Sequence, residues 1–213
     1  MNTAMRAFTS TLFAALFALP LHADAQAGDA SGFGAAIITP ARPVWLLEQP
    51  YADSPKLTAR TVGVSAYGGF HVKASLEISC YPQNPLASLA LQIAPQSLGF
   101  DSDPFEGKDA SANGPLRVTT GTRASIELPV NGVWTDGGAF QIGTLFVLSA
   151  AVPPAELAYW LSDASQGQTL TLSLAPATAG AAPLTATFVL PENNTGLNKI
   201  LRACRGVASA TPR

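Results

Sequence analysis

Charged side chains are scarce in this sequence, and those present do not cluster. Only 12% of the residues are charged, with 12 Lys+Arg against 14 Asp+Glu and a formal net charge of −2. A scattered and balanced set of charges creates no basic field for phosphate backbones, so nucleic acid is not expected as a partner. The hydrophobic content of 47% excludes disorder and predicts a packed core.

Histidine and cysteine are scarcer still, with two of each. No CxxC or His/Cys cluster occurs, which excludes the usual zinc and redox motifs, so neither a metal nor a cofactor is predicted. A serine hydrolase needs a base beside its nucleophile, but no Gly-x-Ser-x-Gly occurs and the only imidazole beyond residue 25 is His71. We interpret His71 as a solvated residue on the polar face of a strand, and no catalytic residue is assigned.

Long hydrophobic runs are also missing, with one exception at the amino terminus. The longest apolar stretch beyond it, Leu145 to Val152, is far shorter than the ~20 residues of a spanning helix, so no membrane span is expected. Arg6, the apolar run 12–21 and the small residues Ala23 and Ala25 match a cleavable secretory leader. Residues 1–25 are therefore predicted to be a signal peptide, and the mature protein is expected to be periplasmic or secreted.

The 17 Pro and 18 Gly divide the rest of the chain into short alternating segments. The clearest is Phe70 to Cys80, where apolar and polar residues alternate strictly. It predicts a strand with Leu76, Ile78 and Cys80 facing the core and with His71, Lys73, Ser75, Glu77 and Ser79 facing water. Leu89, Leu91 and Ile93 predict an antiparallel neighbour, and further strands are expected near residues 44–48, 57–65, 116–118, 126–130, 140–150, 170–174 and 184–190.

Two segments predict helices. Paired prolines precede good helix formers near 154–162, and a stripe of Leu197, Ile200, Leu201 and Cys204 follows a capping position at Asn194 or Thr195, near 195–205. The fold class is therefore mainly β: a single antiparallel β-sandwich domain over 33–206 with these two helices, between flexible tails at 26–32 and 207–213. Trp134 to Gly138 is expected to be a turn.

Cys80 and Cys204 both lie on predicted apolar faces. An exported chain with two cysteines most simply forms one disulfide, and a helix laid over the sheet would bring Cys204 toward Cys80. We therefore predict a buried structural bridge between them.

The segment from Pro95 to Pro115 is longer than most connections and breaks the alternation, which makes it the best candidate for a functional loop. It carries the carboxylates Asp101, Asp103, Glu106 and Asp109, and together with Trp134 and Asp136 these residues form the predicted binding site. A calcium loop is an alternative, but the spacing fails the EF-hand pattern. A carboxylate hydrolase is another, and it requires one carboxyl to be buried.

The order of several motifs resembles the small exported proteins around invasion-associated locus B and the VasI-type accessory proteins of type VI secretion loci. The resemblance runs from about Leu76 to Cys204 and rests on five features: Leu76-Glu77-Ile78-Ser79-Cys80, Trp134 between two strands, Ala155-Glu156-Leu157 before Leu170-Thr171-Leu172, Thr187-Phe188-Val189-Leu190, and Cys204. It implies a periplasmic or cell-surface protein with a binding or accessory role and no catalytic centre.

Two function classes follow. The first is a non-enzymatic periplasmic or secreted binding or accessory protein with a protein partner in the cell envelope, including a secretion-associated role or an inhibitor or immunity partner of a wall-degrading enzyme. The alternative is a wall- or glycan-directed hydrolase that uses the loop carboxylates. Two carboxyls across a cleft, one of them buried, would favour the hydrolase.

Overall fold

The computed structural model describes residues 40–49, 52–81, 84, 86–108, 114–137 and 143–205. For residues 203–205 it describes the backbone only. The described residues belong to one compact unit, Gly34–Arg213. The predicted signal peptide, the amino-terminal tail, the carboxy-terminal tail and Asp109 lie outside them.

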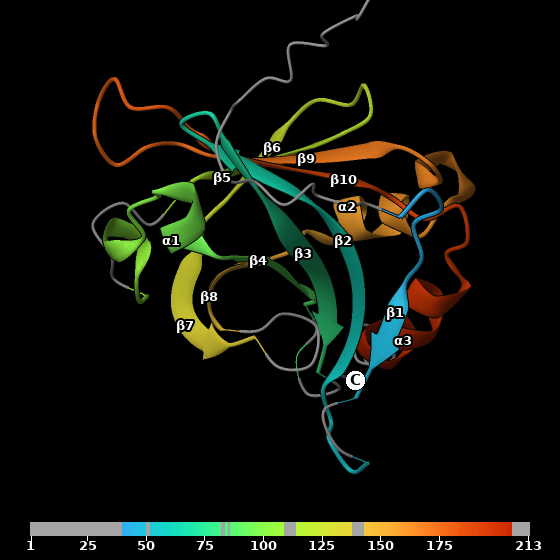
Figure 1. Ribbon diagram of the computed structural model, residues 1–213. Coiled ribbons are helices and arrows are strands. Elements are labelled where there is room, and N and C mark those ends of the chain that lie inside the picture. Colours follow the sequence, from blue (N-terminus) through green and yellow to red (C-terminus); the bar gives the residue numbers. More distant parts are fainter. Residues whose placement is uncertain are drawn as a thin grey trace, which may run out of the picture. The chain divides into compact units, whose positions relative to one another are not determined.

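The described residues form ten strands and three α-helices (Figure 1). The strands are β1 (Leu46–Glu48), β2 (Leu57–Tyr67), β3 (Phe70–Cys80), β4 (Ser88–Ile93), β5 (Leu116–Thr120), β6 (Ile126–Leu128), β7 (Asn131–Asp136), β8 (Thr144–Ala151), β9 (Thr169–Leu174) and β10 (Leu184–Val189). The helices are α1 (Pro95–Leu98), α2 (Pro154–Trp160) and α3 (Thr195–Arg205), with short 3-10 turns η1 (Asp103–Phe105) and η3 (Asp163–Ser165). The predicted mainly β class and both predicted helices are confirmed.

All strands join one antiparallel sheet in the order β6-β5-β9-β10-β2-β3-β4-β8-β7, and β1 pairs with β2 beside this path. The sheet curls, and β2 and β3 run through its middle (Figure 1). β2 pairs with β1 over Thr58–Arg60 and with β10 over Val64–Ala66. β1 therefore lies beside the first half of β2, and β10 lies beside its second half. The predicted antiparallel pairing of β3 with β4 is confirmed.

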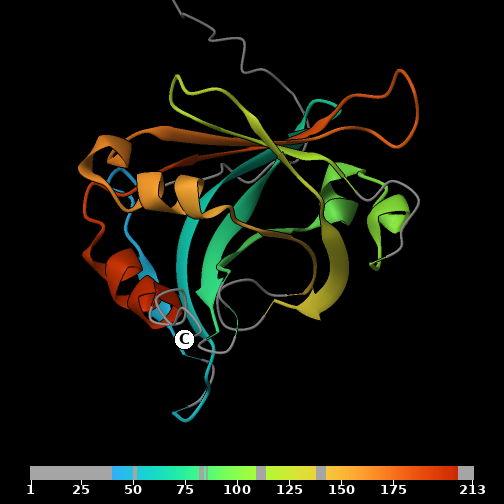
Figure 2. The ribbon, with the colours of Figure 1, turned by 180° about the vertical axis from the view of Figure 1, so that it is seen from behind.

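The core lies against one face of the long strands. Leu76, Ile78 and Cys80 of β3 are buried there, as the alternation predicted, together with Leu89, Leu91 and Ile93 of β4. α3 packs on β1, β2 and β3 with Leu197, Ile200 and Leu201 buried. α2 and α3 lie on the side of the sheet that faces the viewer in Figure 2. Leu145 to Leu148 of β8, a strand expected near 140–150, are all buried.

α2 is held to the sheet by a buried polar network as well as by apolar packing. Trp160 Nε1 donates to Thr120 Oγ1 at 3.0 Å, and the Thr120 hydroxyl donates to Glu156 Oε1 at 3.1 Å. Arg123 Nη1 donates to the other Glu156 oxygen at 2.7 Å, and its guanidinium lies 4.0 Å from the centre of the Tyr159 ring. Glu156 is therefore a buried structural residue, which the apolar stripe of the helix did not predict.

One expectation about an irregular segment is wrong. Residues 131–136 form strand β7, so Trp134, Thr135 and Asp136 are strand residues and not part of a turn. The segment after Pro95 contains α1 and η1, and its side chains Leu98, Phe100 and Phe105 are buried. Phe100 stacks on Phe105 with ring centres 5.6 Å apart, so apolar contacts attach this segment to the body of the fold.

Candidate functional site

The face of β2, β3, β4 and β8 opposite the core carries a row of aligned polar and small side chains. The register places Arg60 opposite Glu77, Glu77 opposite Ala90, and Ala90 opposite Ser149. Directly paired residues in an antiparallel sheet point to the same side, so these four share one face. Because Ala90 and Ser149 are short, they leave space beside the long Arg60 and Glu77 side chains.

This space is a hollow of about 860 Å³, which we call the polar groove. It is lined from six strands and their adjoining segments by Glu48, Gln49, Lys56, Arg60, Glu77, Ser79, Tyr81, Ser88, Ala90, Gln92, Val133, Thr135, Asp136, Gly137, Val147 and Ser149. A mixture of hydroxyls, amides, carboxylates and cations around one concavity is typical of a ligand site.

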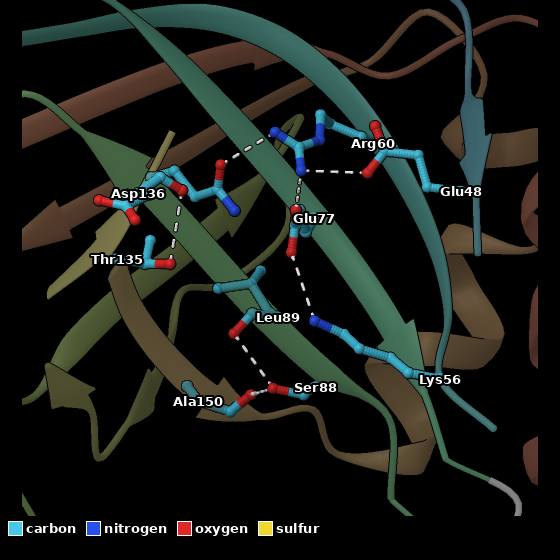
Figure 3. A network of polar contacts seen from close by, with 10 residues as sticks. Glu48, Lys56, Arg60, Glu77, Ser88, Leu89, Thr135, Asp136 and Ala150 are labelled. Carbon is cyan, nitrogen blue, oxygen red and sulfur yellow. Dashed lines mark hydrogen bonds and ion pairs between the residues drawn. The ribbon is translucent and has the colours of Figure 1, made fainter. Parts of the chain in front are cut away.

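Arg60 is the centre of the groove (Figure 3). Its Nη1 donates to Gln92 Oε1 at 3.0 Å, and its Nη2 donates to Glu48 Oε2 at 3.1 Å and to Glu77 Oε1. Lys56 Nζ lies 3.9 Å from Glu77 Oε2. Side chains from β1, β2, β3 and β4 and from the segment before β2 are therefore joined through the Arg60 guanidinium and its acceptors.

The prediction that the polar face of β3 is hydrated along its whole length is wrong. Its amino-terminal half is exposed at His71 and Lys73, but Ser75, Glu77 and Ser79 are buried. Glu77 is only 5% exposed. It lies between β2 and β4, and the Arg60 side chain of β2 donates to it. Sequence alternation identified which side chains share this face, but not that the face is enclosed.

The structure describes three of the four loop carboxylates of the predicted site. Asp101, Asp103 and Glu106 are all exposed, and none of them is among the residues that line the polar groove. The segment reaches the sheet at another point, where the Gly107 amide donates to the Gly132 carbonyl at 2.7 Å. A Cβ atom at Gly132 would meet the Phe105 carbonyl and the Phe146 ring, so glycine permits this close approach. These three carboxylates do not provide the buried general acid of the hydrolase alternative.

The two remaining predicted site residues, Trp134 and Asp136, lie two positions apart on β7. The Trp134 ring packs edge-on against Phe146 with centres 5.2 Å apart, so this indole packs against the core. Asp136 is exposed and lines the polar groove. The structure thus brings Asp136, and not Asp101, Asp103 or Glu106, to the candidate site.

A smaller hollow of about 470 Å³ adjoins the groove and shares Ser88 and Ser149 with it. Its lining is mostly apolar and includes Leu86, Ala87 and Val130. The two hollows therefore meet at β4 and β8.

Comparison with known families, with curated proteins and with solved structures found no match for this chain. The function of the site is therefore argued from its chemistry.

No three His, Cys, Asp or Glu side chains gather in a metal-binding arrangement within the described part of the chain. None of its helices has the length and apolar character needed to cross a membrane. Cys80 is fully buried at the end of β3, and no free cysteine occurs among the described residues. The Cys204 side chain lies outside them, so the bridge between the two cysteines stays a prediction.

Proposed function

We propose that this protein is an exported, non-enzymatic binding or accessory protein of the cell envelope or exterior, and that its ligand or partner enters the polar groove. The observation that carries the proposal is the hydrogen-bonded network of Arg60, Glu77, Glu48 and Gln92 at the centre of a hollow.

The need for stability does not account for such a network. Buried ion pairs contribute little on balance, because desolvation offsets their attraction, and apolar replacements of similar volume are often as stable or more so. Here the charged groups also border a space large enough for a small ligand. Charged side chains that are held rigidly by one another at the wall of a hollow are well suited to orient a polar ligand.

The surroundings of the network support binding more than catalysis. Glu48 and Glu77 share the Arg60 guanidinium, and no thiol or imidazole is found among the described residues that line the groove. Exposed Tyr81 and Val133 flank the polar centre and provide apolar surface for the non-polar part of a ligand. The resemblance over Leu76 to Cys204 implies the same kind of role.

The test is retention of a partner by the mature chain. The protein is immobilised and exposed to cell-envelope extract, and both proteins and small molecules in the eluate are identified by mass spectrometry. A Ser149→Trp variant places an indole in the groove and should abolish retention. A Ser173→Trp variant introduces the same side chain on β9, outside the groove lining, and should retain the partner.

Retention that is equal in both tryptophan variants would place the binding surface elsewhere and overturn the assignment to the groove. Loss of retention on substitution of Asp101, Asp103 and Glu106 instead would move the site to the loop. Mass spectrometry of exported material addresses the compartment, because a protein that begins near Gln26 is expected and a retained leader would contradict it.

A further inference from the structure

The cations of the polar groove are already engaged. Arg60 donates to three acceptors, Gln92, Glu48 and Glu77, and Lys56 lies 3.9 Å from Glu77. An anionic ligand would have to compete with two built-in carboxylates for the same guanidinium. The groove is therefore poorly prepared to bind an anion.

Acceptors, in contrast, remain available. Glu48 Oε1 is buried and has no hydrogen-bond donor among the described residues, although its other oxygen is held by Arg60. Buried polar atoms are nearly always hydrogen-bonded, so this oxygen is a position where an incoming donor is favoured. Asp136 is exposed and makes no ion pair within the part of the chain described.

The net charge of the groove lining also favours a ligand that donates hydrogen bonds and carries a positive charge. Three carboxylates line the groove, Glu48, Glu77 and Asp136, against two cations, Lys56 and Arg60, which leaves one negative charge in excess. A concave surface with an excess of one sign concentrates ligands of the opposite sign. Tyr81 also lines the groove, and an aromatic face attracts organic cations.

Figure 3 shows how these acceptors are arranged. Glu48 lies on one side of the Arg60–Glu77 pair and Asp136 lies on the other. Gln92 accepts from Arg60. A cationic group that entered the groove would thus find Glu48 and Asp136 on opposite sides of the internal ion pair.

We propose that the polar groove binds an organic cation, an ammonium or guanidinium group that donates hydrogen bonds to Glu48 and Asp136. This inference rests on the proposed function and specifies its ligand class. The cation can belong to a free amine or to a Lys or Arg side chain of a partner protein, because the recognised group is the same in both.

The experiment follows backbone amide signals of the full mature protein by NMR during titration. The probes are the diamine cadaverine, its neutral counterpart pentanediol, the dianion glutarate, and capped Ala-Lys-Ala and Ala-Gln-Ala peptides. Cadaverine or the lysine peptide should shift signals of groove residues such as Gln92, Thr135 and Ser149, and their neutral counterparts should not. Added salt should weaken the effect. A response to the diamine but not to the peptide indicates a small ligand, and the reverse indicates a partner side chain.

Two variants test the assigned residues. Glu48→Gln keeps the shape but removes the charge, and it should weaken cation binding about tenfold, as expected for loss of one charge-assisted hydrogen bond. Asp136→Asn is at an exposed position and therefore keeps the test valid if Glu48→Gln fails to fold. Glu127→Gln, an exposed carboxylate on β6 outside the groove, is the matched control and should leave binding unchanged.

The outcomes separate the two proposals. Groove signals that respond only to pentanediol or only to glutarate would overturn the cation assignment and leave the groove as a binding site. Cation binding that is unaffected by both carboxylate variants would also overturn it. If no probe shifts the groove but a ligand retained from extract is lost in Ser149→Trp, the cation inference fails and the proposed function stands. If Ser149→Trp has no effect either, both fail.

Discussion

At the scale of single residues, Arg60 and Glu77 depend on each other. Glu77→Leu removes one acceptor of a buried guanidinium and should lower the free energy of unfolding by about 2–3 kcal/mol. This loss should be smaller than the loss for a buried charge that is left with no partner, because Glu48 and Gln92 still accept from Arg60. Urea unfolding followed by circular dichroism measures it.

The double variant Arg60→Met with Glu77→Leu also removes the guanidinium that donates to Glu48 and Gln92, so it should be no more stable than Glu77→Leu alone. Arg117 and Glu127 provide the exposed comparison, with an N–O distance of 2.9 Å and side chains more than half exposed. Glu127→Leu should cost less than about 1 kcal/mol. Equal losses for the buried and the exposed pair would show that the groove network is solvated.

Thr120 is the second residue whose polar contacts can be tested one at a time. Thr120→Val keeps the shape of the side chain but leaves Trp160 Nε1 without its acceptor and Glu156 Oε1 without its donor, so a loss of about 1–3 kcal/mol is expected in urea unfolding. Thr119→Val is the control, because its hydroxyl contacts Ser125 at an exposed position and should change stability by less than about 0.5 kcal/mol. A neutral Thr120→Val would mean that apolar packing alone holds α2.

At the scale of elements, the α1–η1 segment separates apolar residues that attach it from acidic residues that face water. Phe105 is 1% exposed and stacks on Phe100, so Phe105→Ala should cost about 3–5 kcal/mol in thermal or urea unfolding. Asp103→Ala and Glu106→Ala remove exposed side chains of the same segment and should stay within about 0.5 kcal/mol of the parent protein. A large loss for either acidic variant would reveal a structural ion or a polar network at the loop.

Prediction of secondary structure from the sequence succeeded for two helices and failed for the segment after Pro95 and for β7. Helices α2 and α3 were predicted within a few residues, because prolines, capping residues and an apolar stripe are local signals. The segment after Pro95 has no such periodicity, and its order comes from contacts of Leu98, Phe100 and Phe105 with the rest of the fold. Trp134 was expected in a turn because Gly137 and Gly138 follow it, but pairing with β8 extends β7 through Asp136.

At the scale of the whole molecule, the predicted Cys80–Cys204 bridge would tie the last helix to the centre of the sheet. Replacement of both cysteines by serine, or reduction, should lower the free energy of unfolding by about 2–5 kcal/mol. Loss of the tether lets α3 separate from β1, β2 and β3 and exposes Leu197, Ile200 and Leu201. Thiol labelling of the native protein should detect no free cysteine.

Two results would contradict this prediction. Native protein that reacts with a thiol reagent would show that the bridge is not formed. A double serine variant that is as stable as the parent but no longer binds its ligand would show that the sulfur atoms act in function and not in stability.

The sequence by itself determined the class of fold, most of the strands, two helices and the alternation of faces along the strands it predicted, because these follow from local periodicity and from chain-breaking residues. It also contained part of the groove. Gly68-Gly69 forms a two-residue loop, and counting outward from it pairs Tyr67 with Phe70 and Arg60 with Glu77. Only the tertiary structure decided that this pair is buried and borders a hollow. The reason is that enclosure depends on the sizes of Ala90 and Ser149 and on the position of Glu48, which come from separate parts of the chain and meet only when the sheet curls.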